Sequence, residues 1–111
     1  MAQQHARPGD VIRLEPFGER LAEQRTTALL KAGQLELVRI VLLAGRGLPE
    51  HRAPGEITVL CLEGRIAFET PAGCRTLEPG DLIHLPPLEP HALTALEDAS
   101  ALVTLCLVRP G

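Results

Sequence analysis

The sequence is poor in aromatic residues. Phe17 and Phe68 are its only Phe, Tyr or Trp residues among 111, so stacking of nucleobases or sugars on Trp or Tyr is excluded. An excess of positive charge is also missing. The 11 Lys and Arg residues are interspersed with 14 Asp and Glu residues, and the net charge is −3. Since this leaves no basic patch, we expect no nucleic-acid partner.

Long hydrophobic runs are missing as well. The longest, such as residues 40–44, have the length of a strand and fall far short of the ~20 apolar residues that cross a bilayer. The first ten residues contain no apolar segment of the kind that directs secretion. We therefore expect no membrane association and a cytoplasmic location.

Cysteine is too sparse for a disulfide framework. Cys61, Cys74 and Cys106 form neither an even set nor a C-x-x-C pair. Cys61 and Cys106 lie inside apolar runs, where a free thiol packs as a small core residue, so we expect both to be buried. Cys74 lies in a turn-like region, and we expect it to be exposed.

Turn residues, in contrast, are abundant. Ten Gly and ten Pro separate apolar runs of four to nine residues, which is typical of an all-β sandwich or barrel and not of βαβ units. Turn chemistry agrees, because Glu63-Gly64 suits a tight connection and residues 78–81 suit a type II turn. The predicted strands are Leu35–Leu43, Ile57–Leu62, Arg65–Thr70, Arg75–Leu77, Asp81–Leu85 and Ala101–Val108.

The length predicts one domain over residues 1–111, with a barrel over about 26–108. Residues 1–18 are expected to form an N-terminal arm or an edge strand. Between them, residues 19–31 carry a partial helical stripe, but Thr26-Thr27 favours a strand over Thr26–Lys31. We favour the strand.

Three of the four histidines lie in the predicted barrel. His51 follows Gly45 by six residues and precedes Gly64 by thirteen, and His91 follows Pro86 by five. His84 alternates with Leu82 along a predicted strand, and the sequence does not decide which of its faces is inside. Other catalytic patterns are missing, because the only serine, Ser100, lies far along the chain from every histidine and no Gly-rich phosphate loop is present.

The spacing around these histidines resembles the two motifs of the cupin superfamily over about residues 35–108. Gly45, His51 and Gly64 match the first motif, and Gly80, Pro86 and His91 match the second. Four positions depart from the motifs. A second His is replaced by Ala53, the Glu by Ile57, a Gly by Leu88 and an Asn by Ala95.

The resemblance implies an all-β, double-stranded β-helix (jelly-roll) barrel, open at one end, with a pocket lined by the two motifs. Metal-binding cupins hold iron, manganese, nickel or zinc there through three His and one Glu. Only His51 and His91 keep a donor at the motif positions, so a usable site needs a third ligand from Glu50, Glu56, Glu89 or His84. If Ile57 faces the pocket, Glu56 is expected to face away.

Three functions remain open at this point, and the third of them is a domain that mainly self-associates. The first is a binding module in which His51, His91, Ala53 and Ile57 line a pocket for a small, largely apolar molecule, without a tightly held metal. The second is a metal-dependent enzyme, an oxygenase or isomerase, that uses the two histidines and a nearby carboxylate. Apolar residues of both parities in Leu35–Leu43 indicate a strand covered on two sides, so we expect a homodimer in every case.

Overall fold

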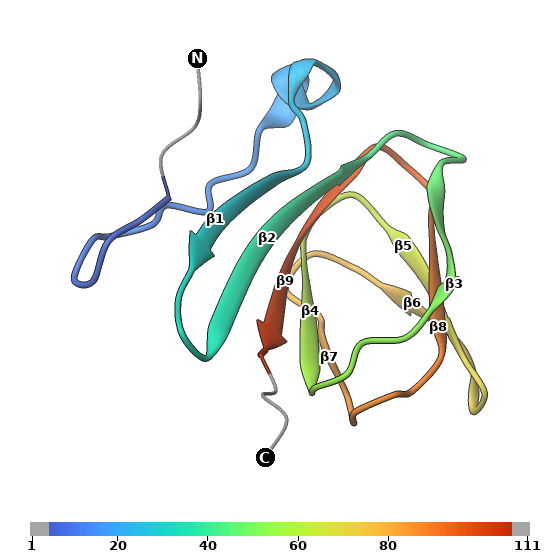
Figure 1. Cartoon of the computed structure of the whole chain (residues 1–111). Coiled ribbons are helices and arrows are strands. Elements are labelled where there is room, and N and C mark those ends of the chain that lie inside the picture. Colours follow the sequence, from blue (N-terminus) through green and yellow to red (C-terminus); the bar gives the residue numbers. More distant parts are fainter. Residues whose placement is uncertain (1–4, 108–111) are drawn as a thin grey trace.

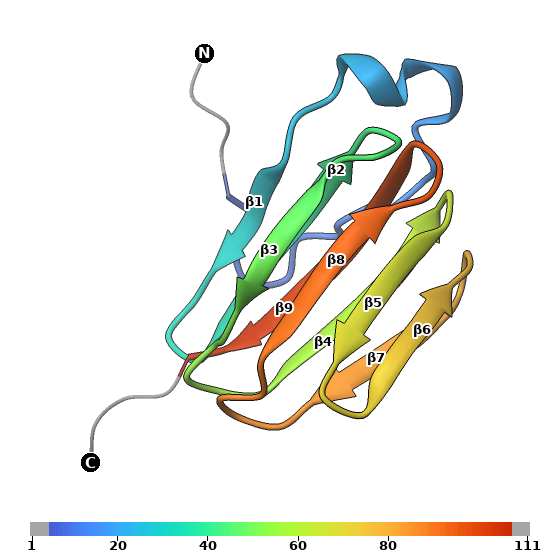
Figure 2. The ribbon, with the colours of Figure 1, turned by 90° about the vertical axis from the view of Figure 1, so that its right-hand side faces the viewer.

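Short strands separated by turns fold into two antiparallel sheets that face each other (Figures 1 and 2). The structure is a computed structural model, and it describes residues 5–107. One sheet has the order β1-β2-β9-β4-β7 and the other the order β3-β8-β5-β6. The strands are β1 (Thr27–Lys31), β2 (Leu35–Leu42), β3 (Gly47–His51), β4 (Ile57–Glu63), β5 (Ile66–Thr70), β6 (Gly73–Leu77), β7 (Leu82–Leu85), β8 (His91–Ala95) and β9 (Ala99–Cys106).

The predicted all-β jelly-roll class is confirmed. Each of the six predicted strands is present within two residues at its described ends, although Val108 lies outside the described residues. β3 and β8 were not predicted, and both carry residues of the two motifs. β9 is inserted between β2 and β4, so strands that are far apart in the chain lie side by side (Figure 1).

Residues 5–17 form an arm without a strand, and a 3-10 helix, η1 (Gly18–Glu23), precedes β1. The strand favoured over residues 26–31 is therefore confirmed, and the helical stripe there is limited to η1. No helix in the described part of the chain is long and apolar enough to span a membrane.

Both predicted turns form, and both need a glycine. Gly64 has φ +77°, and a Cβ there would collide with the carbonyl oxygen of Asp98. Gly80 has φ +92°, and the Asp81 N–H donates to the Glu78 carbonyl oxygen over 2.9 Å, as a type II turn requires.

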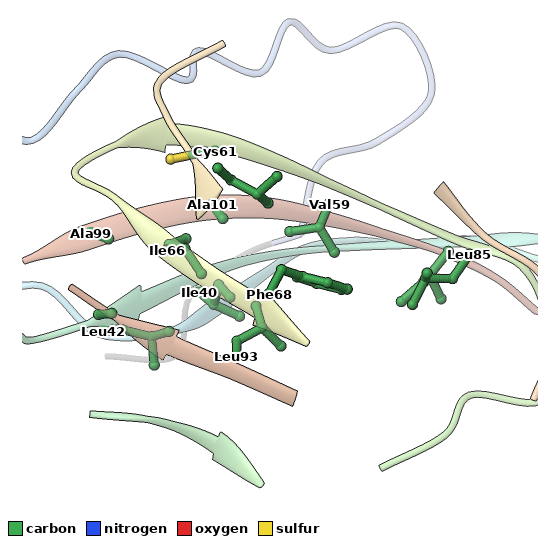
Figure 3. Close-up of a cluster of buried hydrophobic side chains, with 13 residues drawn as sticks. Ile40, Leu42, Val59, Cys61, Ile66, Phe68, Leu85, Leu93, Ala99 and Ala101 are labelled. Carbon is green, nitrogen blue, oxygen red and sulfur yellow. The ribbon is translucent and has the colours of Figure 1, made fainter. Parts of the chain in front are cut away.

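The core lies between the two sheets and follows the alternation of the strands. Val59 and Cys61 on β4, and Ile66 and Phe68 on β5, point inward and are 0–1% exposed. Phe68 lies in the middle of the buried cluster (Figure 3). The expected burial of Cys106 is wrong, because β9 turns alternate residues toward its outer face and Cys106 is exposed at the end of the strand.

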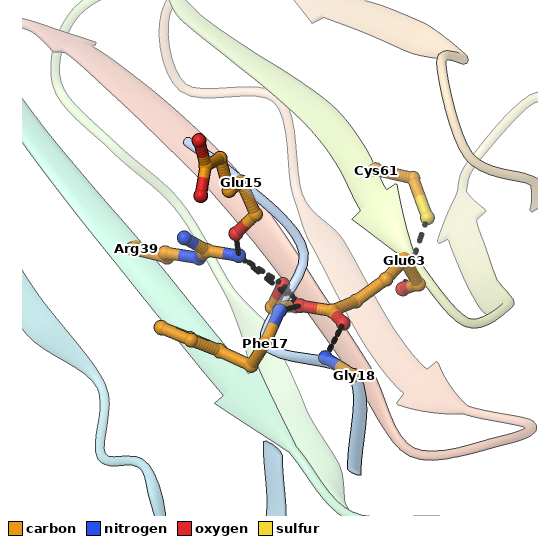
Figure 4. A network of polar contacts seen from close by, with 7 residues as sticks. Glu15, Phe17, Gly18, Arg39, Cys61 and Glu63 are labelled. Atoms are coloured by element: carbon orange, nitrogen blue, oxygen red, sulfur yellow. Dashed lines mark hydrogen bonds and ion pairs between the residues drawn. The ribbon is translucent and has the colours of Figure 1, made fainter. Parts of the chain in front are cut away.

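The outer face of the five-stranded sheet buries an ion pair under the N-terminal arm (Figure 4). Nη2 of Arg39 on β2 donates to the Glu63 carboxylate over 3.1 Å and to the carbonyl oxygen of Glu15 over 2.8 Å. The ring of Phe17 lies 3.7 Å from the Arg39 guanidinium carbon. The arm therefore covers β2 at Arg39, and part of the two-sided burial of this strand comes from the chain itself.

Glu63 is the centre of this network. Its carboxylate also accepts hydrogen bonds from the Phe17 and Gly18 N–H groups and from the Ser100 hydroxyl. Burial alone would raise the pKa of the Glu63 carboxyl. These three hydrogen bonds and the charge of Arg39 outweigh that effect and lower the pKa below its ordinary value of 4.5.

Candidate functional site

A cavity of about 360 Å³ opens between the two sheets at the end where β3 leaves and β4 begins. Its walls are almost entirely aliphatic, and polar side chains are contributed only by two histidines and one arginine. The lining residues are Val38, Ile40, Leu48, His51, Arg52, Ala53, Pro54, Ile57, Val59, His91, Leu93, Val103 and Leu105.

The two histidines come from paired strands. His51 ends β3, His91 begins β8, and the two residues are register partners in the antiparallel ladder. Their ring centroids are 4.1 Å apart, with 59° between the planes. The sheet thus brings together two side chains that are 40 positions apart in the sequence.

Each histidine ring is oriented by a backbone carbonyl two residues earlier. Nδ1 of His51 lies 2.9 Å from the Pro49 carbonyl oxygen, and Nδ1 of His91 lies 2.9 Å from that of Glu89. Since a carbonyl oxygen only accepts, Nδ1 carries the proton in both rings. In the neutral form, Nε2 of each ring is then a free acceptor.

His91 is the more deeply placed of the two. It is 3% exposed and stacks on the ring of Phe68, with centroids 5.7 Å apart and planes within 3°. Burial lowers the pKa of His91 below its ordinary value of 6.5; the hydrogen bond to Glu89 raises it, and the charge of His51 lowers it further. His91 is therefore neutral at pH 7.

Ala53 and Ile57 line the same cavity as the histidines but offer no donor to a metal. Glu56 faces away from it, as expected for the neighbour of Ile57, and its carboxylate lies 2.7 Å from Nε2 of His84. This contact also settles the position of His84, which is exposed on the outer face.

The remaining carboxylates do not complete a metal shell. Glu50 is exposed on the edge strand β3, and the Glu89 contact to His91 is made by its backbone carbonyl. Within residues 5–107, no three His, Cys, Asp or Glu side chains gather closely enough to hold a metal ion. The side chains present therefore do not fit a metal with three or four protein ligands.

Leu88 takes the backbone shape of the glycine that it replaces in the second motif. Its φ is +66°, the one positive φ of a non-glycine residue in the described chain. Its N–H donates to the Ala53 carbonyl oxygen over 2.8 Å, which ties the β7–β8 loop to the β3–β4 loop beside the cavity. The left-handed conformation costs a branched side chain about 1–2 kcal/mol.

Comparison with known families agrees with this geometry. The cupin domain family matches residues 38–108, which include both strands that carry the histidines. The chain belongs to the cupin family. A comparison with curated protein sequences finds no significant match.

Solved cupin-like structures share the fold. A conserved protein of unknown function from Streptococcus pyogenes is 19% identical, with a TM-score of 0.75 over 99% of this chain and 100% of its own. A cupin superfamily protein from Desulfitobacterium hafniense is 16% identical, with a TM-score of 0.76 over 93% and 100%. KdgF from a Halomonas species is 21% identical, with a TM-score of 0.69 over 76% and 78%. At these identities the likeness concerns the fold alone.

Sequence reasoning missed three features of this cupin cavity. The alternation of His91, Leu93 and Ala95 is the signal that could have identified β8. β3 gave no such signal, because it is an exposed edge strand that contains Pro49. The stacking of Phe68 on His91 joins residues from different strands, and no local pattern announces it.

Proposed function

We propose that this cupin binds a small, largely apolar molecule in the cavity between its sheets, without a tightly held metal. The observation that carries the proposal is the cavity itself. Its volume of about 360 Å³ lies within the range of small-molecule sites, and ten of its thirteen lining residues are apolar. The apolar walls favour burial of a hydrocarbon portion.

The polar end of the ligand is assigned to the histidines. With Nδ1 of both rings held by backbone carbonyls, Nε2 of each neutral ring is available to accept a hydrogen bond. A ligand with a hydroxyl or amide N–H at one end matches these acceptors. Arg52, which lines the same cavity and is exposed, adds a donor at the rim.

The alternative is a metal-dependent cupin enzyme that uses His51 and His91. One observation favours it, because histidine ligands in metal sites commonly have their second ring nitrogen held by a carbonyl in this way. The carboxylates needed to complete the shell are the difficulty. Glu56 is paired with His84, and Glu50 lies on the exposed edge strand.

The binding proposal is tested with hexan-1-ol and hexanamide as probes, followed by NMR chemical shifts or calorimetry. We expect saturable binding that perturbs the amides of Leu93 and Leu105. Val103→Phe places a larger side chain of β9 in the cavity and is expected to abolish binding of the probes. Leu82→Phe, at a 61% exposed position on the outer face, is the matched control and retains binding. Absence of saturable binding by both probes would contradict the proposal.

The metal alternative is tested by metal analysis of the purified protein and of a His51→Ala/His91→Ala variant. Stoichiometric iron, manganese, nickel or zinc that disappears in the variant would overturn the metal-free proposal. Metal well below one ion per chain, with no thermal stabilisation by added divalent ions, would overturn the enzyme alternative as stated.

Two further parts of the proposal concern location and assembly. Three free cysteines, two of them exposed, suit the reducing cytoplasm. We also propose a homodimer, for which β2 now gives weaker support because the N-terminal arm covers part of its outer face. Light scattering at micromolar concentration is expected to give twice the 12.0 kDa chain mass, and a value near 12.0 kDa would contradict the dimer.

A further inference from the structure

A second groove lies on the opposite side of β2 from the cavity, between the N-terminal arm, η1 and β1. Its volume is about 430 Å³. Neighbouring residues of β2 point to opposite faces, so Val38 and Ile40 line the cavity whereas Arg39 lines the groove. Nothing in the two cupin motifs contributes to this groove.

The groove concentrates positive charge in an acidic protein. Three arginines line it, Arg13 on the arm, Arg25 before β1 and Arg39 on β2, against one carboxylate, that of Glu23. Because Arg39 is paired with Glu63 behind it, the charge open to a ligand comes from Arg13 and Arg25 and exceeds that of Glu23 by one, whereas the whole chain has −3. Within residues 5–107, neither Arg13 nor Arg25 forms an ion pair.

Arg39 forms the floor of the groove and is held in place by hydrogen bonds. Its side chain is 6% exposed, and its Nη2 atom makes all three of its side-chain hydrogen bonds in the described chain. Nε is buried without a partner, and Nη1 makes no hydrogen bond there. The buried Nε favours an acceptor beside it, because an unmet buried donor costs free energy.

The walls of the groove indicate the kind of anion. Phe17 stacks against Arg39, and Leu29 of β1 also lines the groove. Both supply apolar surface next to the arginines. Guanidinium groups bind carboxylates and phosphates through paired hydrogen bonds, and the volume suits a small molecule.

We infer that this groove binds a small oxyanion, a carboxylate or a phosphate ester with a compact apolar group, between Arg13, Arg25 and Arg39. The anion contacts the guanidiniums, and its apolar group packs on Phe17 and Leu29. Arg13 and Arg25 are exposed, and in this arrangement they bind the anion from the solvent side while Arg39 lies at the base of the groove. This site is independent of the cavity that the proposed function uses.

The inference is tested by NMR titration with phenyl phosphate and benzoate, with benzyl alcohol as the neutral counterpart of the same size. We expect at least one of the two anions to shift the backbone amides of Gln24, Arg25 and Thr27 saturably. Benzyl alcohol is expected to leave these amides unshifted. Whichever anion binds more tightly identifies the phosphate or the carboxylate as the preferred group.

Variants separate a built site from general charge attraction. Arg13→Gln/Arg25→Gln removes two exposed charges and is expected to weaken anion binding at least ~10-fold, because two charge-assisted contacts are lost. Arg20→Gln/Arg46→Gln removes the same charge from exposed positions outside the groove and is expected to leave affinity within about twofold. Unchanged melting temperatures show that both variants fold.

Three results would overturn the inference. They are the absence of a saturable shift with both anions, equal weakening in the two double variants, and equally tight binding of benzyl alcohol. Because hexan-1-ol and hexanamide report on the cavity and not on the groove, failure here leaves the proposed function standing, and the reverse also holds.

Discussion

The inner and outer faces of β2 bury polar groups in different ways. On the inner face, beside Val38 and Ile40, the polar groups are two imidazoles whose Nδ1 atoms lie 2.9 Å from backbone carbonyl oxygens. On the outer face, Arg39 and Glu63 are charged, and the Glu63 carboxylate accepts hydrogen bonds from three other groups. The inner face therefore presents uncharged walls and imidazoles to its cavity, whereas the outer face uses a charged pair that holds the arm in place beside the arginine groove.

Removal of Glu63 is expected to give the largest effect on stability. Glu63→Ala leaves Arg39 charged and buried without its partner and frees three hydrogen-bond donors, so the free energy of unfolding should fall by about 3–5 kcal/mol. Urea denaturation measures it. Glu97→Ala breaks the exposed pair with Arg65, whose N–O distance is 3.9 Å, and should cost less than about 0.5 kcal/mol. Similar losses in the two variants would refute the contrast between buried and exposed pairs.

The second prediction restores metal-ligand donors on the inner face, at the two motif positions that lack them. Ala53→His/Ile57→Glu adds an imidazole and a carboxylate beside His51 and His91, which makes four ligands at one cavity. We expect zinc affinity to rise by roughly 100-fold or more over the natural sequence, measured by competition with a chelating dye. Ala53→Asn/Ile57→Gln, of similar shape, is the control and should bind zinc no better than the natural chain.

Acid is expected to destabilise the two faces in separate pH ranges. The pKa of His91 is lowered in the fold, so the unfolded chain takes up protons first and stability falls as the pH drops below about 6.5. The pKa of Glu63 is also lowered, so its contribution is present above about 4.5 and is lost as the pH falls through the folded value.

Denaturation midpoints at a series of pH values test this order. His91→Gln should reduce the loss of stability below about pH 6.5 and leave the loss below about pH 4.5 unchanged. Glu63→Gln should have the opposite effect. Identical pH profiles for the two variants would show that neither group sets the acid response.

The smallest expected effect is a gain in stability from a substitution in the loop beside the cavity. Leu88→Gly relieves the positive φ at an exposed position, so the free energy of unfolding should rise by about 0.5–1 kcal/mol after the entropy cost of glycine. Leu82→Gly replaces an equally exposed leucine within β7 and should be destabilising by a similar amount. Thermal denaturation measures both changes in stability, which are expected to have opposite signs.

Much of the fold could be predicted from the sequence, because turn glycines and the alternation of apolar residues are patterns within short segments. Gly64 and Gly80 located two turns, and the spacing of His51 and His91 located the residues that line one cavity. Arg39 was not predicted to be buried. Its partners lie in the arm, at the end of β4 and on β9, and their convergence depends on strand order, which local patterns do not encode.

The place of β9 in the sheet has a consequence for how the protein is made. β9 follows every other strand of residues 5–107, yet it fills the gap between β2 and β4 and supplies Val103, Leu105 and Ser100 to the two faces. During synthesis, the facing edges of β2 and β4 therefore wait unpaired until β9 leaves the ribosome. Such edges pair readily with other chains, and contacts between distant segments form slowly, on the order of milliseconds to seconds. We therefore expect chains that still lack β9 to aggregate more readily than the completed fold.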